Sequence, residues 1–336
     1  MLIDGGLSFD PIDAITSGKR AEDDGFDGLW SAETAHDPFF PLLLAAEHTE
    51  RIQLGTGIAV AFARNPMTTA IMANDLHTFS QGRFMLGLGS QIKPHITKRY
   101  SMPWSHPAAR MREFIEALRA IWSAWHDGTK LAFRGDFYTH TLMTPFFNAG
   151  PSDFGTPPVF LAGVGELMTE VAGEVADGLL AHGFTTERYL REITLPALDR
   201  GLAKAGRSRQ GFQISYPAMI VTGANEAERE AAVQAVKAQL AFYGSTPAYR
   251  PVLALHGWGD LHTDLNRLSK KGEWVQMAGL ITDDIVDAFA VTGTPAEIPA
   301  LILDRYGDMV TRVSFYAPYR MDHERVREML AGFRRS

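Results

Sequence analysis

The chain of 336 residues contains no cysteine. That absence excludes a disulfide framework, a thiolate zinc site, an iron–sulfur cluster and a cysteine nucleophile. Basic residues are also in the minority, because 32 Lys and Arg stand against 39 Asp and Glu, for a formal net charge of −7. A nucleic-acid-binding surface needs basic charge to neutralise phosphates, so we expect no nucleic-acid partner.

Long apolar runs are missing as well. The longest run near the start, residues 39–46, is far shorter than the roughly 20 residues that cross a bilayer. The first ten residues lack the basic region and apolar core of a signal peptide. Since 46% of the residues are hydrophobic and 21% are charged, the composition is that of a globular protein. We therefore expect a cytoplasmic protein without a membrane partner.

The common catalytic and phosphate-binding motifs are absent too. The sequence has no G-x-x-x-x-G-K-[ST], no H-E-x-x-H, no G-x-S-x-G and no calcium loop of the EF-hand type. Among 11 histidines, His256 and His262 in HGWGDLH are the best candidate metal ligands, but the glycines between them favour a loop or packing role. Without thiols or a metal cluster, redox chemistry would have to reside on an organic cofactor.

Short apolar runs alternate with amphipathic stretches along the whole chain. The predicted strands cover residues 1–7, 26–31, 52–60, 83–88, 159–163, 178–182, 212–222 and 312–317. The predicted helices cover residues 11–24, 39–49, 66–80, 107–127, 166–176, 186–205, 226–242, 294–306 and 322–335. Eight strands, nearly all followed by a helix, predict parallel pairing and an α/β fold of the (β/α)8 TIM-barrel type.

The length then corresponds to one domain over residues 1–336 with insertions at about 89–158 and 244–293. Within these insertions we expect a hairpin over 129–141 and short helical pieces over 244–290. A doubly wound open sheet is the alternative fold, but it would normally carry G-x-G-x-x-G after its first strand, and this sequence has none there.

In such a barrel, active-site residues lie at the carboxyl ends of the strands. Residues 163–165 (GVG) open a helix there, where backbone N–H groups can bind an anion, although an ordinary tight turn would use the same residues. Residues 87–93 form a second glycine-rich strand end with a hydroxyl and an amide. Residues 33–37 gather two carboxylates and an imidazole for proton transfer, while Asp37 also fits a helix cap.

Five segments in series carry a family likeness. They are DGLWSAE (27–33), IQLGTGIAVAFARNP (52–66), SQGRFMLGLGSQ (80–91), PPVFLAGVGELMTEVAGEVADGLLAHGF (157–184) and TRVSFYAPY (311–319). In this order they resemble the luciferase-like monooxygenase superfamily, and most closely its actinobacterial branch, which uses the deazaflavin coenzyme F420. The resemblance covers nearly the whole chain.

The resemblance implies a TIM-like barrel with a flavin or deazaflavin across its strand ends. In the family, a non-prolyl cis peptide bulges the third strand behind the ring, and the matching bond here is Gly57–Ile58. The residues that match cofactor-binding positions are Gly57, Ile58, Ala59, Ser90, Gln91, Gly163, Val164, Gly165 and His182. Glu33 and His36 are the candidate catalytic residues for proton transfer.

Two departures from the family pattern concern the substrate. Many relatives have an acidic residue followed directly by His after the second strand, whereas here Thr34 follows Glu33 and the histidine is His36. Some sugar-phosphate dehydrogenases of the F420 branch have a Glu just past the glycines of the fourth strand, where this chain has Ile92. The substrate of those dehydrogenases therefore does not carry over.

Coenzyme F420 carries a phosphodiester and an acidic oligoglutamate tail. A basic stretch after the fourth strand could hold that tail, and it comprises Lys93, His95, Lys98 and Arg99, with Arg110 and Arg112 further on. A solvated helical loop would have the same composition. Aromatic residues of the insertions could roof an apolar pocket or lie in the core, namely Trp104, Phe133, Phe137, Tyr243, Trp258 and Trp274.

The sequence thus predicts an F420-dependent oxidoreductase that transfers a hydride between the deazaflavin and a small organic substrate. One alternative is an FMN-dependent two-component monooxygenase, which uses reduced flavin and O2 and needs a flavin reductase as its partner. Another is a non-catalytic deazaflavin-binding protein, because the histidine is displaced and the strand-four Glu is missing. Family likeness also implies a homodimer.

Overall fold

The computed structural model describes residues 1–335, and none of the helices in that range is long and apolar enough to span a bilayer. The described residues form two compact units. The N-terminal unit comprises residues 4–180 and 197–213. The C-terminal unit comprises residues 1–3, 181–196 and 214–335.

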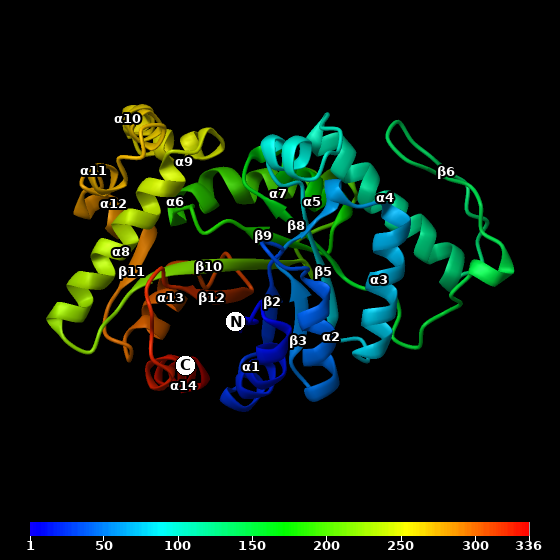
Figure 1. Ribbon diagram of the computed structural model, residues 1–336, viewed down its shortest axis with the longest axis horizontal. Coiled ribbons are helices and arrows are strands. Elements are labelled where there is room, and N and C mark those ends of the chain that lie inside the picture. The colour runs from blue at the N-terminus through cyan, green and yellow to red at the C-terminus, as the bar shows by residue number, and fades with distance from the viewer. Residues whose placement is uncertain (336) are drawn as a thin grey trace. The chain divides into compact units, whose positions relative to one another are not determined.

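Strands and helices alternate along the chain as predicted (Figure 1). The strands are β1 (Leu2–Gly6), β2 (Gly28–Ser31), β3 (Gln53–Thr56), β4 (Ala59–Val60), β5 (Phe84–Gly89), β6 (Phe133–Arg134), β7 (Thr139–His140), β8 (Val159–Gly163), β9 (Gly178–Ala181), β10 (Gln213–Val221), β11 (Ala290–Thr292) and β12 (Arg312–Tyr316). The α-helices are α1 (Pro11–Asp24), α2 (Phe39–His48), α3 (Pro66–Phe79), α4 (Pro107–His126), α5 (Glu166–Val175), α6 (Glu187–Tyr189), α7 (Leu195–Lys204), α8 (Glu226–Gly244), α9 (Arg250–Leu255), α10 (Gly259–Ser269), α11 (Trp274–Ala278), α12 (Asp283–Phe289), α13 (Ile298–Tyr306) and α14 (His323–Arg335).

In the N-terminal unit, the strands pair in parallel in the order β1, β2, β3, β5 and β8, and β4 continues the pairing of β3 with β5. All six residues of β5 are buried, as expected for a parallel strand that is covered on both faces. Helices α2 and α3 lie alongside β3 and β5 in Figure 1. This strand order places the carboxyl ends of β3, β5 and β8 side by side.

In the C-terminal unit, β10 pairs in parallel with both β11 and β12. Its core gathers α8, α10 and α12 through buried residues such as Val236, Leu265 and Phe289. The prediction of short helical pieces over 244–290 is confirmed, because α9 to α12 fill that range. The three-residue strand β11 was not predicted, since so short a strand leaves no alternation in the sequence.

Several local predictions from the sequence are confirmed. Helix α1 ends at Gly25, whose φ of 94° needs the conformational freedom of glycine. The Asn65 side chain caps α3 by accepting the Met67 N–H at 2.8 Å. The apolar stripe of α4 is buried, and its members are Met111, Phe114, Ile115, Leu118, Ile121, Trp122 and Trp125. Strands β6 and β7 form the predicted hairpin.

The third predicted strand, 52–60, is wrong in one respect, because it is broken into β3 and β4. The break contains the Gly57–Ile58 peptide bond, which is cis, as the family resemblance implied. The backbone pairing with β5 extends as far as Gly55 and resumes at Ala59.

The start of one predicted helix and the continuity of another are also corrected. The helix expected over 294–306 begins at Ile298, because the N–H and hydroxyl of Thr294 both donate to the Glu297 carboxylate in a preceding turn. The helix expected over 186–205 is interrupted by a π-helical turn, Leu190–Thr194. Pro196 follows that turn and has no N–H to donate, which favours the wider hydrogen-bonding pattern.

Candidate active site

The predicted cofactor-binding residues of the N-terminal unit come together at one edge of its sheet. Residues 57–59 occupy the break between β3 and β4, residues 90–91 follow β5, and residues 163–165 end β8 and precede α5. Since β3, β5 and β8 are neighbouring parallel strands, these three segments share the carboxyl edge. His182, the remaining predicted residue, follows β9 in the C-terminal unit.

Glycines allow these segments to approach one another closely. A Cβ atom on Gly87 would lie 1.8 Å from the carbonyl oxygen of Thr56, and one on Gly89 would lie 2.7 Å from the Ile58 side chain. The glycines of β5 are therefore required for packing against the break in the third strand. Past this strand, Gln91 has a left-handed backbone with φ of 58°, and its side-chain Oε1 accepts the Ile92 N–H at 3.0 Å.

The N-terminus of α5 is open. Gly165 is its N-cap residue and is exposed, no side chain caps the helix, and a Cβ atom at Gly165 would meet no atom within 4 Å. The acidic Glu166 that follows is balanced by Arg200 at 2.7 Å. Unsatisfied N–H groups at a helix N-terminus attract anions, so this end can receive a phosphate.

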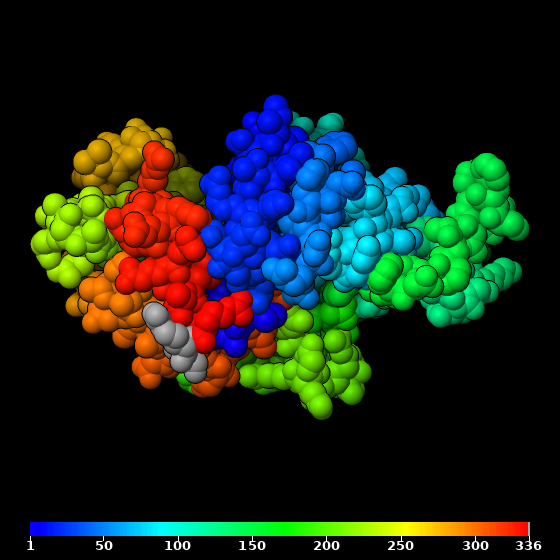
Figure 2. All heavy atoms as spheres, turned by 90° about the horizontal axis from the view of Figure 1, so that it is seen from below, coloured from blue at the N-terminus to red at the C-terminus, as the bar shows by residue number. Residues whose placement is uncertain are grey.

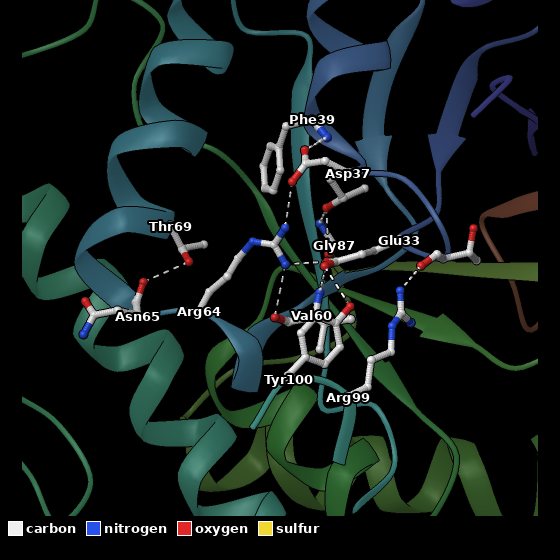
Figure 3. A network of polar contacts seen from close by, with 12 residues as sticks. Glu33, Asp37, Phe39, Val60, Arg64, Asn65, Thr69, Gly87, Arg99 and Tyr100 are labelled. Carbon is white, nitrogen blue, oxygen red and sulfur yellow. Dashed lines mark hydrogen bonds and ion pairs between the residues drawn. The ribbon is translucent and has the colours of Figure 1, made fainter. Parts of the chain in front are cut away.

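Glu33 makes two hydrogen bonds to the backbone at the break in the third strand (Figure 3). Its backbone N–H donates to the Ile58 carbonyl at 3.1 Å, and its carboxylate Oε2 accepts the Val60 N–H at 2.7 Å. Both partners flank Ala59, one of the predicted cofactor-binding residues. The loop after β2 thus fixes the backbone of residues 58–60.

The Glu33 carboxylate lies in a larger polar cluster, which we call the Glu33 cluster (Glu33, Asp37, Arg64 and Tyr100). The Arg64 guanidinium pairs with Glu33 and, at 3.0 Å, with Asp37, while the Tyr100 hydroxyl donates to Glu33 Oε1 at 3.1 Å. The side chains of Glu33 and Arg64 are only 9% and 13% exposed, so the pair is shielded from water. Burial and the neighbouring carboxylate raise the pKa of Tyr100.

Asp37 also accepts the Phe39 N–H at 2.8 Å, which confirms its predicted role as a helix cap. His36, by contrast, is exposed and makes no hydrogen bond or ion pair within the described chain, so the structure does not pair it with Glu33. The sequence reasoning missed Arg64 and Tyr100 as partners of Glu33. Arg64 lies within the third-strand segment of the family likeness (52–66), but no spacing linked Tyr100 to Glu33.

The C-terminal unit contains a second polar cluster around His182, which we call the His182 cluster (His182, Tyr243, Tyr249 and Tyr316). Nδ1 of His182 accepts the Phe184 N–H at 2.9 Å, so its proton is on Nε2, which donates to the Tyr249 hydroxyl at 3.0 Å. Burial lowers the pKa of His182 to about 4. The imidazole is therefore neutral at pH 7.

The three phenols of the His182 cluster come from α8, the following 3-10 turn Pro247–Tyr249, and the end of β12. The hydroxyls of Tyr243 and Tyr316 are 2.8 Å apart. Burial raises the pKa of Tyr249 to about 12, and burial together with the Tyr243 hydrogen bond raises the pKa of Tyr316. Tyr249 and Tyr316 thus stay protonated at neutral pH and can act as hydrogen-bond donors.

Fewer basic side chains are available to an acidic cofactor tail than the sequence indicated. Lys93, His95 and Lys98 are exposed at or near the π-helical turn His95–Arg99. Arg110, however, is buried and donates to the Tyr138 hydroxyl and the Pro103 carbonyl. Arg112 pairs with Glu174, so these two arginines are corrected from tail-binding candidates to structural ones.

The histidines of HGWGDLH have packing roles, as expected. His262 Nδ1 is 2.8 Å from the Gly244 carbonyl oxygen, and His256 Nε2 is 2.8 Å from the Thr186 hydroxyl. No group of three or more His, Asp or Glu in residues 1–335 could hold a metal ion. Of the six aromatic residues proposed as a pocket roof, only Trp274 is exposed, and the other five are partly buried. Tyr243 and Trp258 pack against the hydrophobic core of the C-terminal unit, which favours the core alternative for these two.

Comparison with known proteins identifies the family. Its model, described as Luciferase-like monooxygenase, matches residues 4–312. An uncharacterised protein of Mycobacterium tuberculosis is 57% identical over 311 residues, which cover 93% of this chain and 92% of that protein. The 5,10-methylenetetrahydromethanopterin reductase of Archaeoglobus fulgidus is 29% identical over 319 residues, 91% of this chain and 90% of that protein.

The solved structure of the coenzyme F420 dependent tetrahydromethanopterin reductase from Methanopyrus kandleri has a TM-score of 0.79 at 23% identity, over 98% of this chain and 96% of that chain. This likeness confirms the predicted fold, an α/β barrel of eight parallel strands that closes on itself. The chain therefore belongs to the luciferase-like monooxygenase family, whose members are flavin-dependent or F420-dependent oxidoreductases.

Proposed function

We propose that this chain is an F420-dependent oxidoreductase that transfers a hydride between the deazaflavin and a small organic substrate. The observation that carries the proposal is the edge formed by residues 57–59, 90–91 and 163–165, where backbone and small side chains dominate. A flat ring with a phosphate-bearing chain needs such close backbone approach. Support also comes from the relatives, since the Methanopyrus kandleri reductase is named as F420 dependent.

The residues present fit an anionic deazaflavin. The open N-terminus of α5, with the N–H groups of Val164 and Gly165 beside it, would hold the phosphate. The exposed Lys93, His95 and Lys98 would attract the acidic tail, even though the chain as a whole is net acidic. His182 remains a proposed cofactor-binding residue, and its neutral imidazole would present no charge to the cofactor.

When bound, F420 would supply the two-electron hydride chemistry through its deazaflavin ring. The chain's own contribution begins with Glu33, which we propose as a positioning residue. Its bonds to the Ile58 carbonyl and the Val60 N–H hold the residues that would lie behind the ring. Arg64 and Tyr100 in turn hold the Glu33 carboxylate in place.

Proton exchange is the second contribution of the chain. Glu33 and His36 were both predicted for it, but the two oxygens of Glu33 already accept hydrogen bonds from three donors. We therefore assign positioning to Glu33 and proton exchange with solvent to His36, which is exposed on the same loop. Protonated phenols such as Tyr249 could donate a hydrogen bond to a polar group of the substrate.

Fluorescence titration of the purified apoprotein with F420 and, separately, with FMN tests the proposal. We expect saturable F420 binding and much weaker FMN binding. Tight FMN binding without F420 binding would overturn the proposal in favour of the two-component monooxygenase, which should then consume oxygen when FMNH2 is supplied. A variant such as H36A that binds F420 but loses turnover of a substrate would exclude the non-catalytic alternative.

A further inference from the structure

The hydrogen-bonding groups of the His182 cluster are not all used within the chain. His182 itself has none left, because Nδ1 accepts the Phe184 N–H and Nε2 donates to the Tyr249 hydroxyl. A phenol has one hydrogen that it can donate. Since Tyr249 accepts from His182, its own O–H hydrogen is still to be placed, and it meets no acceptor within residues 1–335. This hydrogen is available to a ligand.

The Tyr243 and Tyr316 hydroxyls leave a second hydrogen unused. They lie 2.8 Å apart, and neither makes another hydrogen bond in the part of the chain that the structure describes. One hydroxyl donates to the other, so the second keeps its hydrogen. Burial and the Tyr243 hydroxyl raise the pKa of Tyr316, and Tyr249 adds to this rise, which places Tyr249 near the pair. Two unused O–H donors are therefore neighbours in the C-terminal unit.

The cluster is rigid and uncharged. The His182 ring stacks on Tyr249 with 4.6 Å between centroids and packs edge to face with Tyr243 at 4.9 Å. Phe184, which is only 1% exposed, packs against both phenol rings. The hydrogen bonds and ring contacts of the cluster within residues 1–335 involve no Lys, Arg, Asp or Glu. A phosphate or carboxylate would lose hydration here and gain no cation.

We propose that the His182 cluster determines substrate specificity by binding the oxygen of an uncharged carbonyl compound. A carbonyl oxygen has two lone pairs and can accept both unused O–H hydrogens. A site built from hydrogen-bond donors rejects analogues without an acceptor, because its polar groups then stay unpaired. All four residues of the cluster are partly exposed, so a small ligand can reach them.

The inference rests on the proposed function only where it calls this ligand the substrate, because binding of the oxygen needs no cofactor. In the proposed reaction, the carbonyl carbon would gain the hydride and its oxygen would gain one proton, giving an alcohol and oxidised F420. A substrate of this class carries no phosphate or carboxylate near the reacting carbonyl.

Binding of ketones to the apoprotein, followed by carbon NMR of the labelled carbonyl, tests the site. The probes are acetone, cyclohexanone and acetophenone, which differ in size, and the matched anions are acetate, cyclohexanecarboxylate and benzoate. We expect saturable binding of at least one ketone, with its carbonyl resonance moved downfield because hydrogen bonds withdraw electron density from the carbon. Binding of no ketone, or equal binding of a ketone and its matched anion, would overturn the proposal.

Variants that remove hydroxyls but keep the rings locate the binding. In Y249F, and in the double variant Y243F/Y316F, ketone affinity should fall about tenfold, the size expected for one neutral hydrogen bond. The downfield shift of the bound carbonyl should also become smaller in both. Unchanged ketone affinity in Y249F and in the double variant would show that the ketone binds elsewhere.

The matched control is Y319F, which removes a phenol hydroxyl of the same unit whose hydrogen is already used. Tyr319 donates to the Ile220 carbonyl at 3.1 Å and accepts the Thr222 N–H at 3.0 Å. It lies in the segment after β12, which Figure 2 shows in red at the surface, beside the yellow-green start of α8. Ketone affinity should be unchanged in Y319F, and a tenfold loss there would overturn the assignment to the His182 cluster.

Titration of the same proteins with F420 separates this inference from the proposed function. Ketone binding without F420 binding would leave the oxygen-binding site standing and overturn the naming of its ligand as the substrate of an F420 enzyme. F420 binding without ketone binding would overturn the site and leave the proposed function standing.

Discussion

The Glu33 cluster and the His182 cluster are built in opposite ways. The Glu33 cluster balances two carboxylates against Arg64 and attaches them to backbone N–H groups of the third strand and of α2. The His182 cluster holds a neutral imidazole among phenols, and burial shifts the pKa values of His182 and Tyr249 away from charge. Charged side chains thus hold the backbone in the N-terminal unit. In the C-terminal unit, desolvation keeps the side chains of the His182 cluster neutral, and they bind one another through hydrogen bonds.

Lowering the pH should give the largest difference between the two clusters, because it acts on the stability contributed by His182. The pKa of His182 is about 4 in the folded chain and 6.5 in its ordinary state, so the unfolded chain binds this proton first as the pH falls. The contribution of His182 to the free energy of unfolding should therefore be fully present above pH 6.5. It should decline by up to about 3 kcal/mol as the pH falls to 4.

Urea denaturation of the wild type and of H182N at pH 7 and pH 5 measures this effect. The H182N variant should lose most of the difference between the two pH values. H36A is the matched control, because His36 is exposed and its removal should leave the difference unchanged. An equal pH difference in wild type and H182N would show that His182 is not the group responsible.

The next largest effect should come from Glu33. In E33A, the Val60 N–H and Arg64 lose their shared acceptor, so residues 58–60 lose one of their two attachments to the loop after β2. We expect F420 affinity to fall about 100-fold, or about 2.7 kcal/mol. E33Q keeps an oxygen for the Val60 N–H and should lose only about tenfold, measured by fluorescence titration.

A positioning role for Glu33 also predicts that E33Q retains substantial turnover at saturating F420. Loss of turnover in E33Q with unchanged F420 affinity would instead indicate proton transfer by Glu33. Y316F, in the His182 cluster, is the matched control, since it removes a hydroxyl that contacts Tyr243 rather than a proposed cofactor-binding residue, and it should leave F420 affinity within a fewfold of the wild type.

A smaller effect is expected at the N-terminus of α5. In G165D, a carboxylate would cap the helix and place negative charge where we propose the phosphate binds. F420 affinity should fall about tenfold without a loss of unfolding free energy. G165A adds a methyl group into open space and should bind F420 normally, so weakened binding in both variants would point to a backbone effect.

The smallest effect should come from Y316F in the His182 cluster. The substitution removes one end of the 2.8 Å contact between the hydroxyls of Tyr243 and Tyr316. The free energy of unfolding should fall by about 1 kcal/mol, the net worth of a neutral hydrogen bond. A loss several times larger, measured in urea, would mean that the phenols act as one network, and Y243F should then show the same loss.

Much of the fold could be predicted because local patterns encode it. The apolar stripe from Met111 to Trp125 predicted α4, and Asn65 with Pro66 predicted the start of α3. The broken third strand and the late start of α13 escaped prediction. The third strand escaped because its apolar pattern continues through residues 57–58. The start of α13 escaped because Thr294 is a residue type that commonly caps helices, but here its hydroxyl donates to Glu297 within a turn that precedes the helix.

Part of the candidate site could also be predicted from the sequence, and part of it could not. Glycines 163 and 165 and their helix were visible in the sequence, and family likeness located the cis bond at Gly57. The partners of Glu33 were not visible, because Arg64 lies 31 residues away and Tyr100 lies 67 residues away. No periodicity connects side chains at such separations.

By itself, the sequence determined the alternation of strands and helices, the parallel barrel they form, and the absence of thiol chemistry. Those properties follow from hydrophobic period, helix caps and composition, all of which are local. Only the tertiary structure decided that the Glu33 carboxylate binds the Val60 N–H and Arg64, that His182 is buried against Tyr249, and that Phe146 is exposed. Charge pairing, desolvation and exposure depend on neighbours that are distant in the chain, and packing alone brings those neighbours into contact or keeps them away.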